Sequence, residues 1–262
     1  MISALDLDLT GRIAVVTGVS RRRGIGAAVC RALAAQGADL YFTHWRPFDR
    51  EQPYGADEDG PAVLLGELRA TGRRVEAREV DLSLPEAPHL VLDTATERLG
   101  QPSILINNAA HSTRDGYERL DAATLDAHYA VNLRATALLS VEFARRHTGG
   151  PGRIVNLSSG QSLGPMPEEL AYAATKGAIE AFTRTLAAEV ASKGITVNAI
   201  NPGPTDTGWM SDEVREALLP KFGLGRLGQA EDAARLIVFL ASDGGGWITG
   251  QVIHSEGGFL RW

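Results

Sequence analysis

Short apolar runs alternate with helical patterns from one end of the chain to the other, and this alternation limits the possible folds more than any other feature. The first run, Arg12–Thr17, is rich in β-branched residues and ends at Gly18, which is typical of a buried parallel strand. An Ala-rich amphipathic stretch follows as far as Gln36, and Gly37 closes it as a helix C-cap. A second strand over Asp39–Thr43 then completes one β-α-β unit.

The same order continues toward the carboxyl end. Further strands are predicted over 74–80, 103–106, 154–157, 195–200 and 251–254, and helices over 61–70, 85–99, 121–146, from about 171 onward, and 231–240. No linker, internal repeat or low-complexity tract divides the chain. We therefore predict an α/β fold made of a single domain, a doubly wound parallel sheet (Rossmann fold) with helices on both faces. The segment His44–Gly60 shows no periodicity and is predicted to be a long exposed loop.

The composition argues against several classes of protein. A net charge of −6 gives no electrostatic reason to expect nucleic acid or an anionic membrane as a partner. Cys30 is the single cysteine, which excludes an intrachain disulfide and a Cys-rich zinc site, and the six histidines show no metal-binding spacing. No apolar window is long enough to span a membrane, and the start, MISALDLDLTGR, lacks the features of a signal peptide. We expect a cytoplasmic protein without a metal.

The turn after the first strand contains three spaced glycines. A strand, a glycine turn and a helix in this order place free backbone N–H groups at a strand end, which suits an anionic pyrophosphate. Gly18 permits the tight turn, Gly24 allows close approach, and Gly26 lets the helix pack on the strand. A glycine-rich connection without a ligand is the alternative. The turn resembles the TGxxxGxG motif of the short-chain dehydrogenases/reductases, with two extra residues between Gly18 and Gly24.

This resemblance implies a nicotinamide cofactor. At the end of the second strand, where an NAD-selective member places a carboxylate, the sequence has His44 with no acid beside it. Nearby guanidinium groups that can meet a 2′-phosphate are those of Arg21, Arg22, Arg23 and Arg46. NADP(H) is therefore favoured over NAD(H), although Asp49 and Glu51 in the long loop oppose this prediction.

Other positions also match the family's cofactor site. Asp81 matches an aspartate that binds the adenine, or else caps a helix, and Asn107-Asn108-Ala109-Ala110 matches the NNAG motif with its glycine replaced. The predicted cofactor-binding set is Gly18, Ser20, Arg21, Arg23, Gly24, Ile25, Gly26, His44, Arg46, Asp81, Leu82, Asn108, Ala109, Ala110, Tyr172, Lys176, Pro202, Gly203, Thr205 and Thr207.

Tyr172 and Lys176 are four residues apart on a predicted helix, so they lie on one face of it. A lone pair of this kind is usually an ordinary surface feature. The resemblance adds Ser159, thirteen residues before the tyrosine, and Asn132 upstream, as members of a catalytic set. It implies that Tyr172 is the general acid or base, with its pKa lowered by Lys176, which also holds the nicotinamide ribose. Ser159 would bind the substrate oxygen, and Asn132 would position a water that relays protons.

The segment at about 204–228 is predicted to form a substrate lid. The residues predicted to line the substrate site are Ser159, Gln161, His111, Trp209 and Met210. Similarity is greatest to 3-oxoacyl-(acyl carrier protein) reductase-like members, which implies a small carbonyl or alcohol substrate, free or carrier-bound. Sugars, steroids and polyketides are alternative substrates, and a catalytically silent NADP(H)-binding sensor or scaffold is the alternative function. A homodimer or homotetramer is expected by resemblance.

Overall fold

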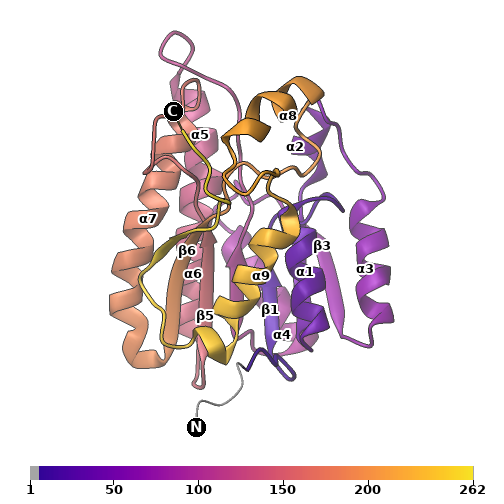
Figure 1. The fold of residues 1–262 in the computed structure, drawn as a ribbon. Coiled ribbons are helices and arrows are strands. Elements are labelled where there is room, and N and C mark those ends of the chain that lie inside the picture. Colours follow the sequence, from indigo (N-terminus) through magenta and orange to yellow (C-terminus); the bar gives the residue numbers. More distant parts are fainter. Residues whose placement is uncertain (1–5, 262) are drawn as a thin grey trace.

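A computed structural model describes residues 6–261, and within them the chain forms one seven-stranded parallel sheet between two layers of helices (Figure 1). The strands are β1 (Ile13–Val16), β2 (Asp39–His44), β3 (Val75–Glu79), β4 (Ile104–Asn107), β5 (Gly152–Leu157), β6 (Ile195–Asn201) and β7 (Val252–His254). Their order is β3-β2-β1-β4-β5-β6-β7, and every neighbouring pair is parallel. The predicted doubly wound sheet is confirmed.

The residues of β1 explain why its sequence is a continuous apolar run. Ala14 and Val16 join a core with α1 (Ile25–Ala35), α3 (Gly60–Ala70) and α9 (Ala230–Ala241). Ile13 and Val15 point to the other face and join a core with α4 (Ala87–Leu99), α6 (Thr136–Arg146) and α7 (Leu170–Val190). Because successive strand residues face opposite sides, a strand covered on both faces needs apolar residues at every position.

The order of the sheet reverses between β1 and β4, and this point locates the candidate site. From β1 the chain continues outward to β2 and β3, whereas β4 begins the other half of the sheet. The segments after β1 and β4 therefore diverge around a crevice at the carboxyl ends of the strands, where open α/β sheets bind ligands. Figure 1 shows α2 (Arg46–Arg50), α5 (Ala122–His128) and α8 (Asp212–Leu218) grouped at the end of the sheet that lies away from the N-terminus.

One prediction of local structure is wrong. The segment His44–Gly60 is not an exposed loop throughout, because His44 ends β2, residues 46–50 form α2, and the Asp49 side chain is buried. A helix of five residues has too little periodicity to be recognised in a sequence. The predicted helical region over 121–146 is confirmed, and within it a π-helical turn, η1 (Tyr129–Ala135), connects α5 to α6.

The carboxyl-terminal part of the predicted lid contains little regular structure. After α8, a short 3₁₀ turn, η3 (Leu219–Lys221), leads to Phe222, which pairs with Phe259 near the end of the chain. Two further 3₁₀ turns are η2 (Ala191–Lys193) and η4 (Asp243–Gly245). None of the helices within residues 6–261 combines the length and apolar character that crossing a bilayer requires.

Candidate active site

The glycine-rich turn packs so closely on the segment after β4 that two of its glycines, Gly18 and Gly26, have no room for side chains. Gly18 has φ of 73°, and a Cβ there would lie 2.5 Å from the Ala109 Cα. A Cβ on Gly26 would lie 2.8 Å from Asn108 Nδ2. The same Asn108 amide donates to the carbonyl oxygens of Thr17 and Gly18, each at 2.9 Å. Asn108 therefore fixes the turn against the NNAA segment.

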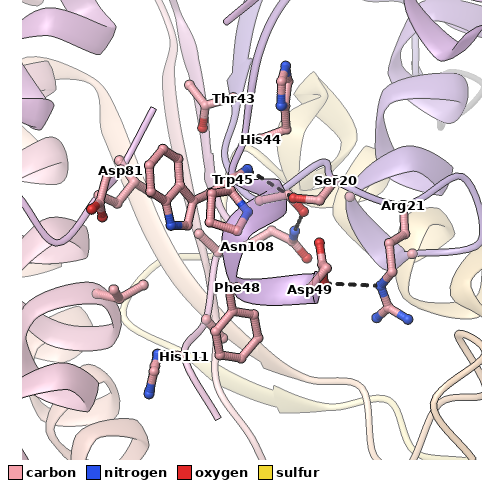
Figure 2. Close-up of a pocket in the computed structure, with 18 of the residues that line it drawn as sticks. Ser20, Arg21, Thr43, His44, Trp45, Phe48, Asp49, Asp81, Asn108 and His111 are labelled. Atoms are coloured by element: carbon pink, nitrogen blue, oxygen red, sulfur yellow. Dashed lines mark hydrogen bonds and ion pairs between the residues drawn. The ribbon is translucent and has the colours of Figure 1, made fainter. Parts of the chain in front are cut away.

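A cavity of about 540 Å³ lies in front of this turn, and Figure 2 shows its walls. Its volume is in the range of small-molecule sites. The predicted cofactor residues that line it are Gly18, Ser20, Arg21, Gly24, Ile25, Gly26, His44, Asp81, Leu82, Asn108, Ala109, Ala110 and Thr207. Those outside its lining are Arg23, Arg46, Tyr172, Lys176, Pro202, Gly203 and Thr205.

The α2 segment forms one wall of this cavity, which the sequence reasoning missed. The Phe48 ring packs against the His111 ring, with ring centres 5.0 Å apart, and both residues line the cavity (Figure 2). Asp49 is only 6% exposed and lies 3.6 Å from Arg21, and burial raises the pKa of its carboxyl. The only sequence signal was the presence of aromatic residues, Phe48 and Tyr54, in an otherwise polar segment.

Each of the four arginines near the cavity has a carboxylate partner. Arg46 pairs with Glu79 at 2.6 Å, and Arg22 pairs with Asp57 at 2.8 Å. The remaining pairs are Arg21 with Asp49 at 3.6 Å and Arg23 with Asp206 at 3.8 Å. Arg21 also donates to the Thr207 carbonyl at 3.1 Å, which joins the glycine turn to the predicted lid.

The expectation that no acid lies beside His44 is wrong. The parallel register places Glu79 of β3 directly opposite His44, and its carboxylate is 3.4 Å from His44 Nδ1. The two residues are far apart in the sequence, so the absence of a neighbouring acid along the chain says nothing about the adjacent strand.

Lys176 and Tyr172 lie together on α7, beside the end of β5. The Lys176 ammonium is 5.4 Å from the centre of the Tyr172 ring and donates to the Leu157 carbonyl at 2.6 Å. Lys176 is 3% exposed, and burial lowers its pKa to about 8.

Burial raises the pKa of Tyr172 to about 12, with a further increase from the charge of Glu169, while a hydrogen bond from Ser159 opposes the change. The lowering of this pKa that the resemblance implied is therefore not produced by the protein groups alone. A buried phenol loses hydration that its anion needs more than its neutral form does.

Asn132 connects the cavity to α7, the helix that carries Tyr172 and Lys176. Its carbonyl oxygen accepts from the His111 backbone N–H at 2.7 Å, and its amide donates to the His111 carbonyl at 2.9 Å. The same amide donates to Thr175 on α7 at 3.1 Å. Asn132 lies in the π-helical turn η1, and single π-turns of this kind often occur at functional sites.

The two adjacent serines have different surroundings. The Ser158 hydroxyl donates to the buried Glu180 carboxylate at 2.9 Å, so it is directed into the protein. The nearest polar partner of Ser159, besides the Tyr172 phenol, is the Met166 sulfur at 3.9 Å. This arrangement supports the choice of Ser159 as the serine beside the tyrosine.

Three of the predicted substrate residues are turned away from the cavity. The Gln161 amide donates to Glu180 at 2.7 Å. Trp209 is exposed, and its indole N–H donates to the Thr205 carbonyl at 2.9 Å. Met210 is 3% exposed and does not line the cavity. Of the predicted substrate residues, His111 lines the cavity and Ser159 lies beside Tyr172.

One support of α7 was missed because it comes from a distant loop. The buried Asp115 carboxylate accepts from the backbone N–H groups of Leu170 at 2.7 Å and Ala171 at 2.8 Å. It therefore caps the first turn of α7, which carries Tyr172. Glu169, at the usual N-cap position, makes no such bond with its side chain.

Comparison with known proteins gives matches over nearly the whole chain. A family model described as enoyl-(acyl carrier protein) reductase matches residues 18–260. The uncharacterized oxidoreductase YjdA of Bacillus subtilis is 54% identical over 253 residues, which cover 95% of this chain and 97% of that protein.

A second relative, the 3-oxoacyl-[acyl-carrier-protein] reductase FabG of Pseudomonas aeruginosa, is 35% identical over 262 residues, covering 96% of this chain and 98% of that protein. Among solved structures, a blue fluorescent protein from a metagenomic library, in complex with NADPH, superposes with a TM-score of 0.86. It is 32% identical, and the match covers 97% of this chain and all of that one (100%). Among residues 6–261 no cluster of His, Cys, Asp or Glu is arranged to hold a metal ion.

Proposed function

The chain belongs to the short-chain dehydrogenase/reductase family of oxidoreductases, and we propose that it transfers a hydride between NADP(H) and the carbonyl or secondary alcohol carbon of a small substrate. One observation carries this proposal. Tyr172, Lys176 and Ser159 meet at the end of β5, and Asn132 links them to His111 in the cavity wall. Hydride transfer and proton transfer would therefore take place in neighbouring parts of one site.

The residues present fit a dinucleotide. The crowded contacts of Gly18 and Gly26 leave a bare backbone surface at the start of α1, where a pyrophosphate can approach the N–H groups. Asp81 and Leu82 would lie against the adenine, and Asn108 to Ala110 would line the path toward the nicotinamide. When bound, the cofactor supplies or accepts the hydride.

We propose NADP(H) over NAD(H) as the cofactor. The support is the position of Arg46 beside His44 at the end of β2, together with the similarity to a structure that contains NADPH. Arg46 already pairs with Glu79, so a 2′-phosphate would compete with this carboxylate for the guanidinium. A guanidinium forms two parallel hydrogen bonds to a phosphate, which favours the exchange.

The proposed proton transfer uses the phenol of Tyr172. In the direction of reduction, its hydroxyl donates a proton to the substrate oxygen while the adjoining carbon gains the hydride. The raised pKa of Tyr172 keeps the phenol protonated near neutral pH but makes it a weaker acid than an ordinary tyrosine, so the transfer requires stabilisation of the phenolate. Ser159 would donate a hydrogen bond to the same oxygen and stabilise its developing charge. Charged Lys176 would favour the phenolate that remains.

For the substrate we propose a 3-oxoacyl-thioester-like compound or another small ketone. The relative from Pseudomonas aeruginosa carries the name of a 3-oxoacyl reductase, which supports this class over sugars, steroids and polyketides. By resemblance we also propose that the protein assembles as a homodimer or homotetramer, which light scattering coupled to size-exclusion chromatography tests.

The test is oxidation of NADPH with a panel of 3-oxo esters, diketones and aldehydes. Saturable turnover is expected with at least one 3-oxo compound, and Tyr172→Phe is expected to abolish it while leaving NADPH binding intact. Tyr117→Phe is a matched control, because Tyr117 is 86% exposed and its hydroxyl donates to the neighbouring Glu118 carboxylate at 3.0 Å. NADPH binding without turnover on the whole panel, or full activity of Tyr172→Phe, would refute the proposal and favour a silent sensor.

A further inference from the structure

The last described residues of the chain connect the lid to the loop that carries Ser159. Phe259 pairs with Phe222 of the lid, with ring centres 5.0 Å apart. The Leu260 backbone N–H donates to the Lys221 carbonyl at 2.8 Å. The next residue, Arg261, leaves the lid and extends to the β5–α7 loop, where it donates to the Gly160 carbonyl at 3.3 Å.

The Arg261 guanidinium is held from its other side by a carboxylate. It donates to both oxygens of Glu256, at 2.7 and 3.3 Å, and each side chain is only 11% exposed. Glu256 also accepts from the Asn201 amide at 2.8 Å, at the end of β6. A two-pronged pair of this kind fixes the orientation of the guanidinium plane. The pair therefore lies between the ends of β5 and β6, both next to the proposed reaction site.

Two glycines in the β5–α7 loop make room for Arg261. A Cβ on Gly160 would lie 1.9 Å from Arg261 Nη2, and a Cβ on Gly164 would lie 2.7 Å from Arg261 Cδ. Neither glycine has a positive φ, so the backbone conformation does not require glycine at either position. A side chain at either position would displace the Arg261 side chain from its present place. The loop beside Ser159 thus fits the arginine side chain closely.

We propose that Arg261 is a positioning residue that holds the Ser159 loop against the end of β6 through the Gly160 carbonyl and the Glu256 carboxylate. This inference rests on the proposed function, because it needs Ser159 to bind the substrate oxygen. Arg261 itself does not touch the reacting atoms. Its contribution is to keep the Ser159 hydroxyl at the distance from Tyr172 that the reaction requires, and small displacements of a catalytic group reduce rates strongly.

The first experiment compares Arg261→Ala with Arg261→Lys and with Arg235→Ala. Arg235 is a matched control, since it forms an exposed pair with Asp232 on α9. Arg261→Ala is expected to lower kcat by about 10- to 100-fold, the size of effect that misplacement of a catalytic group produces. The Kd for NADPH should stay within about twofold of its original value, because the dinucleotide cavity does not include Arg261.

Recovery with a small cation separates positioning from loss of stability. Millimolar guanidinium is expected to restore part of kcat in Arg261→Ala, whereas ethylammonium should not, because only the planar cation can bond Glu256 and Gly160 together. The kcat of Arg261→Lys should be lower than the kcat of Arg261→Ala in the presence of guanidinium. A normal kcat per folded molecule in Arg261→Ala, with only the melting temperature reduced, would overturn the inference.

A double-mutant cycle gives a second, independent test. Gly160→Ala forces a methyl group into the space of the guanidinium, so it should lower kcat in the original chain. In the Arg261→Ala background the same substitution should have little further effect, because its clash partner is gone. Additive losses would contradict the inference. An unchanged kcat in Ser159→Ala would refute the proposed role of the serine itself. A reduced kcat in Ser159→Ala together with a normal kcat in Arg261→Ala would refute the role of Arg261 alone.

Discussion

Asp115 supports the catalytic helix from a loop that is 55 residues earlier in the chain, and replacing it should reduce both stability and activity. Its carboxylate caps the first turn of α7, and its own backbone N–H donates to the Glu168 carbonyl at 2.8 Å. Glu168 has φ of 63°, in the left-handed region that non-glycine residues rarely occupy. Asp115 thus holds both the strained residue before α7 and the turn that contains Tyr172.

The expected loss in Asp115→Ala follows from the groups left without partners. Loss of an N-terminal cap costs about 1 kcal/mol. The N–H of Ala171, which is fully buried, would lose its acceptor at an additional cost of about 1–3 kcal/mol. A total of about 2–4 kcal/mol corresponds to a fall in melting temperature of roughly 5–15 °C for a chain of this size. Displacement of the first turn should lower kcat by about 10-fold or more.

Thermal unfolding and steady-state kinetics measure these two effects. Asp115→Asn keeps one acceptor oxygen, so its losses in stability and kcat should be smaller than those of Asp115→Ala. Asp121→Ala is the matched control, because Asp121 caps another helix, α5, through the Thr124 N–H at 2.8 Å and is exposed. It should cost about 1 kcal/mol and leave kcat unchanged.

The dependence of the stability difference on pH provides a further check. Burial acts to raise the pKa of Asp115, but its bonds from backbone N–H groups outweigh burial and lower the pKa below the usual 3.8. The folded state therefore favours the ionised carboxyl, and its stabilising contribution is present above pH 3.8 and lost as the pH falls below that value. The reasoning would be refuted if Asp115→Ala lost no more stability than Asp121→Ala and kept full kcat.

Two further predictions concern charges in and near the cavity. Arg46→Ala should weaken NADPH binding more than NADH binding, whereas Glu79→Gln, which releases Arg46, should raise the preference for NADPH. Calorimetric titration with each cofactor measures these affinities. Equal effects on NADPH and NADH binding would contradict the prediction. Lys176→Met should abolish turnover yet stabilise the fold by up to about 3 kcal/mol at pH 7, because burial lowers the lysine pKa from 10.5 to about 8. The gain in stability should shrink as the pH rises from about 8 to 10.5, because in this range the folded lysine binds fewer protons than the unfolded one. The prediction would be refuted if chemical unfolding at pH 7 showed the Lys176→Met variant to be less stable than the original protein.

The sheet and its two helix layers could be predicted because their signals are local and repeated. The continuous apolar run of β1, for example, is visible within four positions. The α2 segment could not be predicted in the same way. Its helix is five residues long, and it is held by contacts such as Phe48 against His111 and Asp49 beside Arg21, all of them between segments distant in sequence.

The environment of His44 shows a second limit. Sequence reasoning tested for an acid along the chain, whereas the acid that matters, Glu79, comes from the neighbouring strand through the β2–β3 register. A pattern of single residues contains no information about which residue of another strand stands opposite. Predictions of cofactor preference from the end of β2 alone are therefore incomplete for this fold.

The residues proposed to react and the residues that hold them differ in how they can be found. Tyr172 and Lys176 share one helix, so their spacing alone brings them together. The supporting bonds join residues that are distant in the sequence. Asn132 and His111 are 21 residues apart, Ser158 and Glu180 are 22 apart, Asp115 and Leu170 of α7 are 55 apart, and Arg261 and Gly160 are 101 apart. Only the fold creates these contacts, and each fixes a loop or the end of a helix rather than a reacting group. Substitutions among them should therefore change kcat more than the Kd for NADPH, which separates them from residues of the dinucleotide cavity.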